Sequence, residues 1–266
     1  MFIARHGIVS SQQVVTTART KDFLLVTGIT DPLISTALSD MEADLLKYNL
    51  IDKLTALYPF VGGSEHTHRY NFIDINKYNI AFTSGVTHDL SGITGDGSNG
   101  YGDTGYNVET SSTDRNSVHI SIYQRNNIAE QKTQIGASNN SGGCGLAIFT
   151  RYPNNESYGQ TYNPSTLKLS PSSDSRGFFL STRTTSNSSN FYRIHNDQKF
   201  TTSSKSNTSS TVSGNVYILG NGTNKLFNYS SANLSFATIG TGLNEDDVFN
   251  LSTIVQNFQT KLERQV

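Results

Sequence analysis

The hydrophobic pattern of this chain changes its period at Pro59. Before Pro59, apolar residues such as Leu33, Ala37 and Met41 recur at three- and four-residue spacing, which is the pattern of an amphipathic helix. After Pro59 the spacing falls to two, so apolar and polar residues alternate as they do along a strand. The chain is therefore predicted to be mainly β, with a helical segment at its N-terminus.

The N-terminal segment contains three predicted helices. The apolar run Phe23–Val26 is followed by Gly28, which favours the left-handed conformation of a helix C-cap. Asp31, or the threonine before it, can cap a second helix that has proline at its first position and continues to Lys47. A third helix is expected over Ile51–Leu57.

The middle of the chain is predicted to form an antiparallel β-sandwich or jelly roll, because short alternating segments are separated by loops rich in Ser, Asn and Gly. A hairpin is expected over Tyr192–Lys199, with Asn196 and Asp197 supplying the turn. The predicted strands are residues 69–74, 80–88, 118–123, 146–152, 177–184, 191–195, 215–219 and 234–239.

A last helix is predicted over residues 244–264. Asn244 can cap it, acidic residues occupy its first turn, and Lys261 and Arg264 lie in its last turn, which matches the helix dipole at both ends. Its apolar residues form one seam. We expect this seam to pack on the sandwich or on the N-terminal helices, although a coiled-coil contact is the alternative.

Composition excludes several classes of protein. The formal net charge of -1, with 15% charged residues, gives no basic face for nucleic acid. Cys144 is the single cysteine, so no intrachain disulfide forms. The N-terminus lacks the apolar core of a signal peptide and no window approaches a membrane span, so the protein is expected in the cytosol, without membrane insertion. Residues 1–19 are expected either as an arm that pairs with another chain or as a loosely ordered terminus.

The sequence offers two candidate metal sites. His66 and His68 would share one face of a strand, but no third ligand follows at a telling distance. Asp96 and Asp103 bound a stretch of oxygen donors and glycines that could hold calcium, although it lacks the glutamate of an EF-hand and also suits a turn. No cofactor is expected, with calcium left open.

No catalytic residues are predicted. Ser98 lacks the first glycine and the strand-to-helix turn of a nucleophile elbow. Glycoside cleavage needs two opposed carboxylates, and the acids of the β region are scattered singly. Tyrosines in or near loops are more informative, because an aromatic face beside amide side chains can hold a sugar. The predicted carbohydrate-binding residues are Tyr101, Tyr106, Tyr158, Tyr162 and Asn99.

Two pairs of passages resemble the opening and closing of tailed-phage virion proteins that place a laminin-G-like, concanavalin A-like jelly roll between a helical hairpin and a C-terminal helix. These passages are Thr27–Pro32 with Leu54–Gly63, and Phe236–Leu243 with Phe258–Val266. Asp96–Tyr101 is similar to the Asp-Gly-x-x-x-Tyr turn of laminin-G-like domains, and Asp174–Phe179 and the Asn196 hairpin also fit. Gly100 stands where those domains often carry Asp, which puts a transferred calcium site in doubt.

The resemblance implies a virion structural protein, assembled in the host cytoplasm and displayed on a head fibre, tail fibre or baseplate. The change of pattern at Pro59 divides the chain into an N-terminal arm and helical docking segment over residues 1–60 and a laminin-G-like sandwich over 61–243, followed by a helix over 244–266 that packs on the sandwich or on the N-terminal helices. Expected partners are other virion proteins, further copies of the chain and a host-surface glycan. The alternatives are a polysaccharide-degrading enzyme on the same fold and a capsid decoration protein without a ligand.

Overall fold

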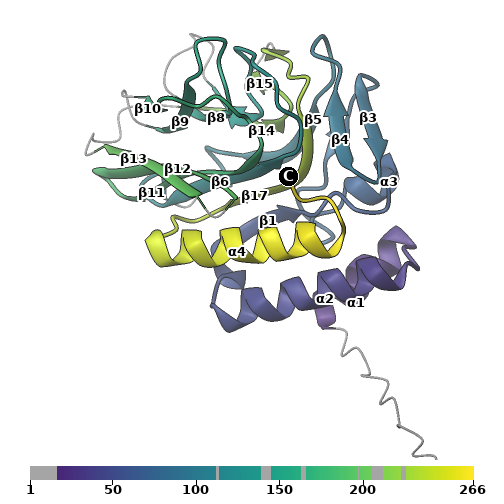
Figure 1. Cartoon of the computed structure of the whole chain (residues 1–266). Helices are drawn as coiled ribbons and strands as arrows, with labels where there is room; N and C mark the ends of the chain where they lie inside the picture. The colour runs from purple at the N-terminus through teal and green to yellow at the C-terminus, as the bar shows by residue number, and fades with distance from the viewer. Residues whose placement is uncertain are drawn as a thin grey trace, which may run out of the picture.

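The protein is mainly β and consists of two stacked antiparallel sheets with helices on one side (Figure 1). The computed structural model describes residues 17–111, 114–138, 145–162, 166–196, 198–204, 212–222 and 226–266. The predicted arm falls largely outside these residues, and Cys144 and Asp197 fall outside them entirely. The predicted mainly β class, with two antiparallel sheets and a helix toward each end, is confirmed.

The first sheet has eight strands. Its order is β13 (Gln198–Ser204), β12 (Ser188–His195), β11 (Gly177–Thr185), β6 (Val118–Gln124), β17 (Asn233–Gly240), β4 (Gly92–Gly95) and β3 (Val86–Asp89), with β1 (Leu54–Tyr58) also paired to β17. The predicted hairpin is present as β12 and β13, with Asn196 in the turn at a φ of 49°.

The second sheet has seven strands. Its order is β10 (Leu167–Leu169), β9 (Ser157–Thr161), β8 (Leu146–Phe149), β7 (Ile135–Ala137), β14 (Asn215–Ile218), β5 (Gly102–Asn107) and β2 (Ala81–Phe82). A separate two-stranded ribbon joins β15 (Asn221–Gly222) to β16 (Leu226–Phe227).

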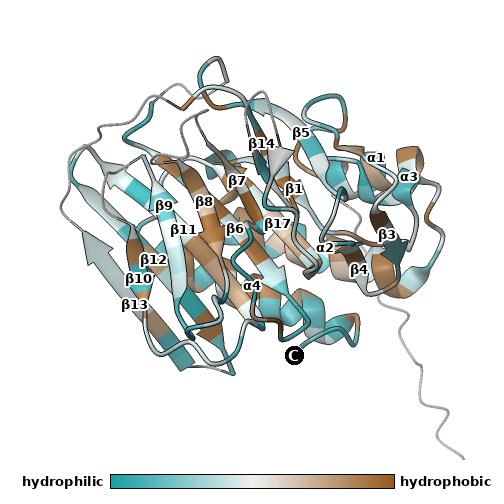
Figure 2. Cartoon of the chain, turned by 90° about the horizontal axis from the view of Figure 1, so that it is seen from above, coloured by the Kyte–Doolittle hydropathy of each residue, from teal (hydrophilic) through white to brown (hydrophobic). Residues whose placement is uncertain are grey.

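The central strands β6 and β17 of the first sheet are buried on both faces, because the second sheet covers one face and helices cover the other, whereas the edge strand β13 is largely exposed. On β6, Ile120 and Ile122 belong to the core between the sheets, whereas Tyr123 belongs to the core under the helices. The polar residues of this strand are also buried, and Ser121 shares a hydrogen bond of 2.5 Å with Thr238 on β17. Figure 2 shows hydrophobic residues gathered on β6, β7 and β8.

The helical layer consists of α1 (Ala18–Thr27), α2 (Pro32–Lys47) and α4 (Glu245–Lys261), and α4 lies between the first sheet and α2 (Figure 1). Gly28 ends α1 at a φ of 69°, as predicted. Asp31 caps α2 by accepting from the Leu33 amide at 2.8 Å. Asn244 caps α4 in the same way, because its side-chain oxygen accepts a hydrogen bond from the Asp247 amide. No helix among the described residues has the length and apolarity needed to cross a membrane.

The predicted helix over Ile51–Leu57 is wrong. Only Ile51–Lys53 is helical, as the 3-10 turn η1, and Leu54–Tyr58 forms strand β1. This strand pairs with β17, which lies about 180 residues further along the chain, so long-range hydrogen bonding decides its conformation. The part of the chain before residue 60 therefore supplies a strand of the sandwich.

The predicted strand over residues 69–74 is also wrong, since this segment has no regular structure. Asn71 is fully buried beside β1. Its side chain accepts from the Leu57 amide at 3.0 Å and donates to the Thr55 carbonyl at 3.1 Å. A side-chain amide thus satisfies backbone groups of β1 that a neighbouring strand would otherwise pair.

Candidate functional site

A groove of about 640 Å³ lies over β8 and β9 of the second sheet. Its described lining combines aromatic rings with amide and hydroxyl groups and one ammonium group. The lining residues are Gln131, Lys132, Ser138, Phe149, Tyr152, Tyr158, Gln160, Thr166, Asn221 and Asn228.

Strand alternation places the first residues of the groove. Along β9, Ser157, Gly159 and Thr161 are buried, whereas Tyr158 and Gln160 between them are partly exposed. Because successive side chains of a strand point to opposite faces, Tyr158 and Gln160 point away from the core. On β8, Ile148 lies in the core between the sheets, so its neighbour Phe149 also points outward.

Three aromatic rings form one continuous wall of the groove. The ring centres of Phe149 and Tyr152 are 5.6 Å apart, and those of Tyr152 and Tyr158 are 4.7 Å apart. Partial burial raises the pKa of Tyr152, so its hydroxyl is a neutral donor and acceptor at physiological pH. Burial, followed by a hydrogen bond to Glu156, likewise raises the pKa of Tyr158. The wall therefore offers apolar faces with polar tips, which suits the C–H face of a sugar ring.

Asn221 supplies an unused hydrogen-bond acceptor. Its side chain is 8% exposed, and its Nδ2 donates to Thr133 Oγ1 at 3.3 Å. Its Oδ1 is buried and has no partner among the described residues. An unpaired buried carbonyl costs about 1–3 kcal/mol, so a ligand hydroxyl that donates to Asn221 would recover free energy.

The acidic residues beside the groove are already engaged. Glu156 accepts from Lys168 Nζ and from Asn154 Nδ2, each at 2.8 Å. The bond from Lys168, followed by that from Tyr158, lowers the pKa of Glu156. Glu130 accepts from Gln134 Nε2 at 3.0 Å and from the side chain of Ser231 at 2.8 Å. Both carboxylates therefore hold neighbouring side chains in place by accepting hydrogen bonds from them.

Of the five predicted carbohydrate-binding residues, Tyr158 lies in the groove. Tyr101 belongs to a separate aromatic cluster, with its ring centre 5.7 Å from that of Tyr217 and 6.2 Å from that of Tyr229. Asn99 is exposed in the loop between β4 and β5, where its carbonyl accepts from Thr83. The structure does not bring these three residues into one site.

Tyr106 and Tyr162 are core residues, which corrects their prediction as sugar contacts. They are 3% and 0% exposed and pack between the two sheets. Tyr106 occupies one of the alternate positions of β5 that face the core, and its ring centre is 5.2 Å from that of Tyr78. Tyr162 has a φ of 57°, which breaks the alternation of β9 and turns the side chain inward. Neither ring can reach a ligand at the surface.

The two acids predicted for calcium have structural hydrogen bonds. Asp96 Oδ1 accepts from the backbone amides of Ser98, Asn99 and Gly100 at 2.8–2.9 Å, so the carboxylate closes the turn after β4 and its pKa is lowered. Asp103 Oδ1 accepts from the Gly105 amide at 2.8 Å and from Asn215 at 2.9 Å. Across the described parts of the chain, no three His, Cys, Asp or Glu side chains gather in a way that could hold a metal ion.

The predicted histidine pair is also separated. Residues Glu65–His68 form the short helix α3, so His66 and His68 do not share the face of a strand. His66 is exposed and contacts the Val26 carbonyl at 3.2 Å. His68 is buried and faces His88, with 3.1 Å between their Nδ1 atoms, and burial lowers its pKa to about 3.

Sequence reasoning did not place Phe149, Gln160, Asn221 or Lys132 in a site. Alternation within Leu146–Phe149 and Ser157–Thr161 carries a signal for the first two, once the inward residues are known. Asn221 and Lys132 lie outside the long strands. Their positions depend on how loops fold over the second sheet, which no local pattern indicates.

Comparison with protein-family models gives no match for this chain, and comparison with curated proteins gives none.

Proposed function

We propose that this protein is a phage virion component that binds host-surface glycans in the groove over β8 and β9. The observation that carries the proposal is the wall of Phe149, Tyr152 and Tyr158 beside the unpaired buried carbonyl of Asn221. Stacking surfaces with a few fixed polar groups are what a sugar-binding site requires. The resemblance to tailed-phage virion proteins supplies the biological setting.

The engaged carboxylates favour binding over cleavage. A glycosidase needs one carboxyl group that donates a proton and another that acts as base or nucleophile. Beside this groove, Glu130 and Glu156 accept hydrogen bonds from neighbouring side chains, and Glu156 has a lowered pKa. A lowered pKa leaves a carboxyl without the proton that a general acid must donate.

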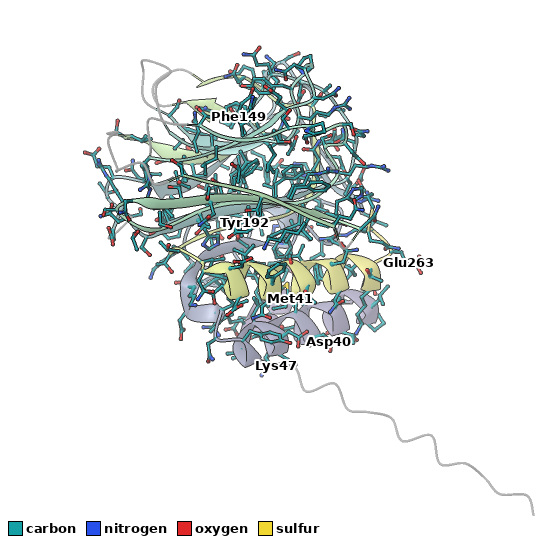
Figure 3. The ribbon with its side chains drawn as sticks, turned by 60° about the vertical axis from the view of Figure 1, so that its left-hand side comes forward. Asp40, Met41, Lys47, Phe149, Tyr192 and Glu263 are labelled. Carbon is teal, nitrogen blue, oxygen red and sulfur yellow. The ribbon has the colours of Figure 1, made fainter. Side chains whose placement is uncertain are left out.

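The arrangement of the helical layer supports display of the groove. Figure 3 shows Phe149 across the molecule from Asp40 and Met41 of α2, with Tyr192 of the first sheet between them. Leucine side chains are exposed on the helical layer, with Leu25 at 81% and Leu33 at 46%. Covering Leu25 and Leu33 in a complex would remove their apolar side chains from water, which favours association. We propose that α1 and α2 dock on other virion proteins or on further copies of the chain, while the groove faces outward.

The proposal is tested by mixing the full chain with surface polysaccharide purified from the host. We expect saturable binding with a Kd in the micromolar to millimolar range and no change in the polymer length. Progressive shortening of the polymer would instead support the degrading enzyme. Absence of binding at millimolar sugar would support a decoration protein without a ligand.

A further inference from the structure

The charge inside the groove indicates which kind of sugar it takes, an inference that rests on the proposed glycan binding. Among the described lining residues, Lys132 is the one with a formal charge. It is partly buried, and no hydrogen bond or ion pair joins its ammonium group to another described residue. Among the described residues, the groove thus presents a cation without a counter-ion.

The neighbouring acidic residues do not form an ion pair with Lys132. Glu156 forms its ion pair with Lys168, with 2.8 Å between Nζ and Oε1. Glu130 directs its oxygens to Gln134, Ser230 and Ser231. A positive charge within a concave surface attracts anions more strongly than the same charge on an open surface, because the low-dielectric walls focus its field.

We propose that the groove binds an anionic saccharide, whose carboxylate or sulfate group pairs with Lys132. The aromatic wall would hold the ring of the sugar, and the buried carbonyl of Asn221 would accept from one of its hydroxyls. The three contacts differ in chemistry, so a neutral sugar of the same shape can make two of them and leaves Lys132 unpaired. The charged group therefore sets specificity, while the wall and the amide supply general affinity.

The test compares three hexasaccharides of one backbone by calorimetry at low and physiological salt. The first carries glucuronic acid, the second is the same oligosaccharide with its carboxyl groups reduced to alcohols, and the third is that reduced form bearing sulfate esters. We expect the wild-type protein to bind at least one charged form about tenfold more tightly than the reduced form, with a preference that weakens as salt is added. The two charged forms distinguish carboxylate from sulfate.

Two variants assign the preference to its residue. Lys132→Gln is expected to bind all three forms with the affinity of the reduced one, whereas Lys132→Arg retains a preference for charge. Lys47→Gln, on α2 at the helical layer, is the matched control and should behave as wild type. Thermal unfolding of each variant checks that the fold is intact.

Each alternative result has one meaning. Equal binding of charged and reduced forms, or a preference that survives in Lys132→Gln, would overturn the anionic specificity and leave glycan binding in the groove standing. Failure of the wild-type protein to bind any of the three, together with failure to bind host polysaccharide, would instead overturn the proposed function itself.

Discussion

Phe149 on β8 and Tyr158 on β9 are directly opposite each other in the second sheet, and both side chains point away from the core. Directly opposed residues in an antiparallel pair have Cβ atoms about 5 Å apart, so both rings start from neighbouring points of the sheet. Tyr152, which follows β8, joins the two rings, since its ring centre is 5.6 Å from that of Phe149 and 4.7 Å from that of Tyr158. The aromatic wall of the groove is therefore a product of sheet register.

Removing the wall should weaken glycan binding without unfolding the protein. Tyr158→Ala is expected to raise the Kd for host polysaccharide about tenfold, which corresponds to a loss of about 1.4 kcal/mol of binding free energy. The double variant that combines Tyr158→Ala with Phe149→Ala should lose more binding free energy, because two rings of the wall are removed. Calorimetry measures both effects.

The matched control for the wall is Tyr48→Ala. Tyr48 is 37% exposed and follows the last residue of α2, a helix that lies on the opposite side of the molecule from β8 and β9 (Figure 1). It should retain the wild-type Kd. Equal loss of affinity in Tyr48→Ala and Tyr158→Ala would mean that the groove is not where the glycan binds.

The contact between α4 and the first sheet should contribute strongly to stability. Phe258 of α4 is 3% exposed, and its ring centre is 6.0 Å from that of Phe236 on β17. Phe258→Ala leaves a cavity in this core and is expected to lower the free energy of unfolding by about 3–5 kcal/mol. Phe249→Ala, at a half-exposed position of the same helix, should cost far less. Urea denaturation that gave equal losses for the two would contradict the packing of α4.

Stability should fall in mild acid, and His119 is one cause. This side chain is fully buried, with Nδ1 2.5 Å from the Thr241 carbonyl and Nε2 3.0 Å from Thr238 Oγ1. Burial lowers its pKa from 6.5 to about 4. Between these two values the unfolded chain binds the proton and the folded chain does not, so the free energy of unfolding decreases as pH falls from about 6.5 to 4.

The pH effect is measured as a difference between two proteins. His119→Gln removes the titrating group. The variant is expected to be less stable than wild type at neutral pH, and this difference in the free energy of unfolding should shrink by up to about 1.4 kcal/mol for each unit by which the pH falls across this window. His66→Gln, at an exposed histidine, serves as the control. Parallel stability curves for wild type and His119→Gln between pH 7 and 4 would disprove the role of His119.

The exposed leucines of the helical layer should matter for assembly and not for folding. Leu25→Asp and Leu33→Asp change exposed side chains, so the free energy of unfolding should move by no more than about 0.5 kcal/mol. We expect each to reduce the amount of protein recovered in purified particles. Phe200→Asp, on the edge strand β13, is the comparison at a half-exposed site away from α1 and α2. Normal incorporation of both leucine variants would refute docking through these helices.

The elements that the sequence predicted well are those with local causes. Asp31, Asn244 and Gly28 cap or end their helices through bonds and dihedral angles that involve only neighbouring residues. Strand β1 could not be predicted in this way. The short, mostly apolar segment Leu54–Tyr58 fits a helix or a strand equally well, and its partner β17 lies far along the chain.

The candidate site was predicted only in part, because the direction of a tyrosine depends on its place in a strand. Tyr158 and Tyr162 are four residues apart and would share a face if β9 continued unbroken. The positive φ of Tyr162 turns it into the core instead. Tyr106 lies among glycines and looks like a loop residue in sequence, yet it belongs to β5. Composition predicted that tyrosines contact a sugar, but the strand register determines which of their rings lie at the surface.

The most direct test of the central idea, a glycan held by the wall over β8 and β9, is to map the bound sugar on the protein. The full chain, with labelled Phe and Tyr rings, is titrated with host oligosaccharide and followed by nuclear magnetic resonance. We predict that the signals of Phe149, Tyr152 and Tyr158 shift together with one Kd, while those of buried Tyr106 and Tyr162 show smaller changes. Shifts confined to Tyr48 and other rings of the helical layer would contradict the account.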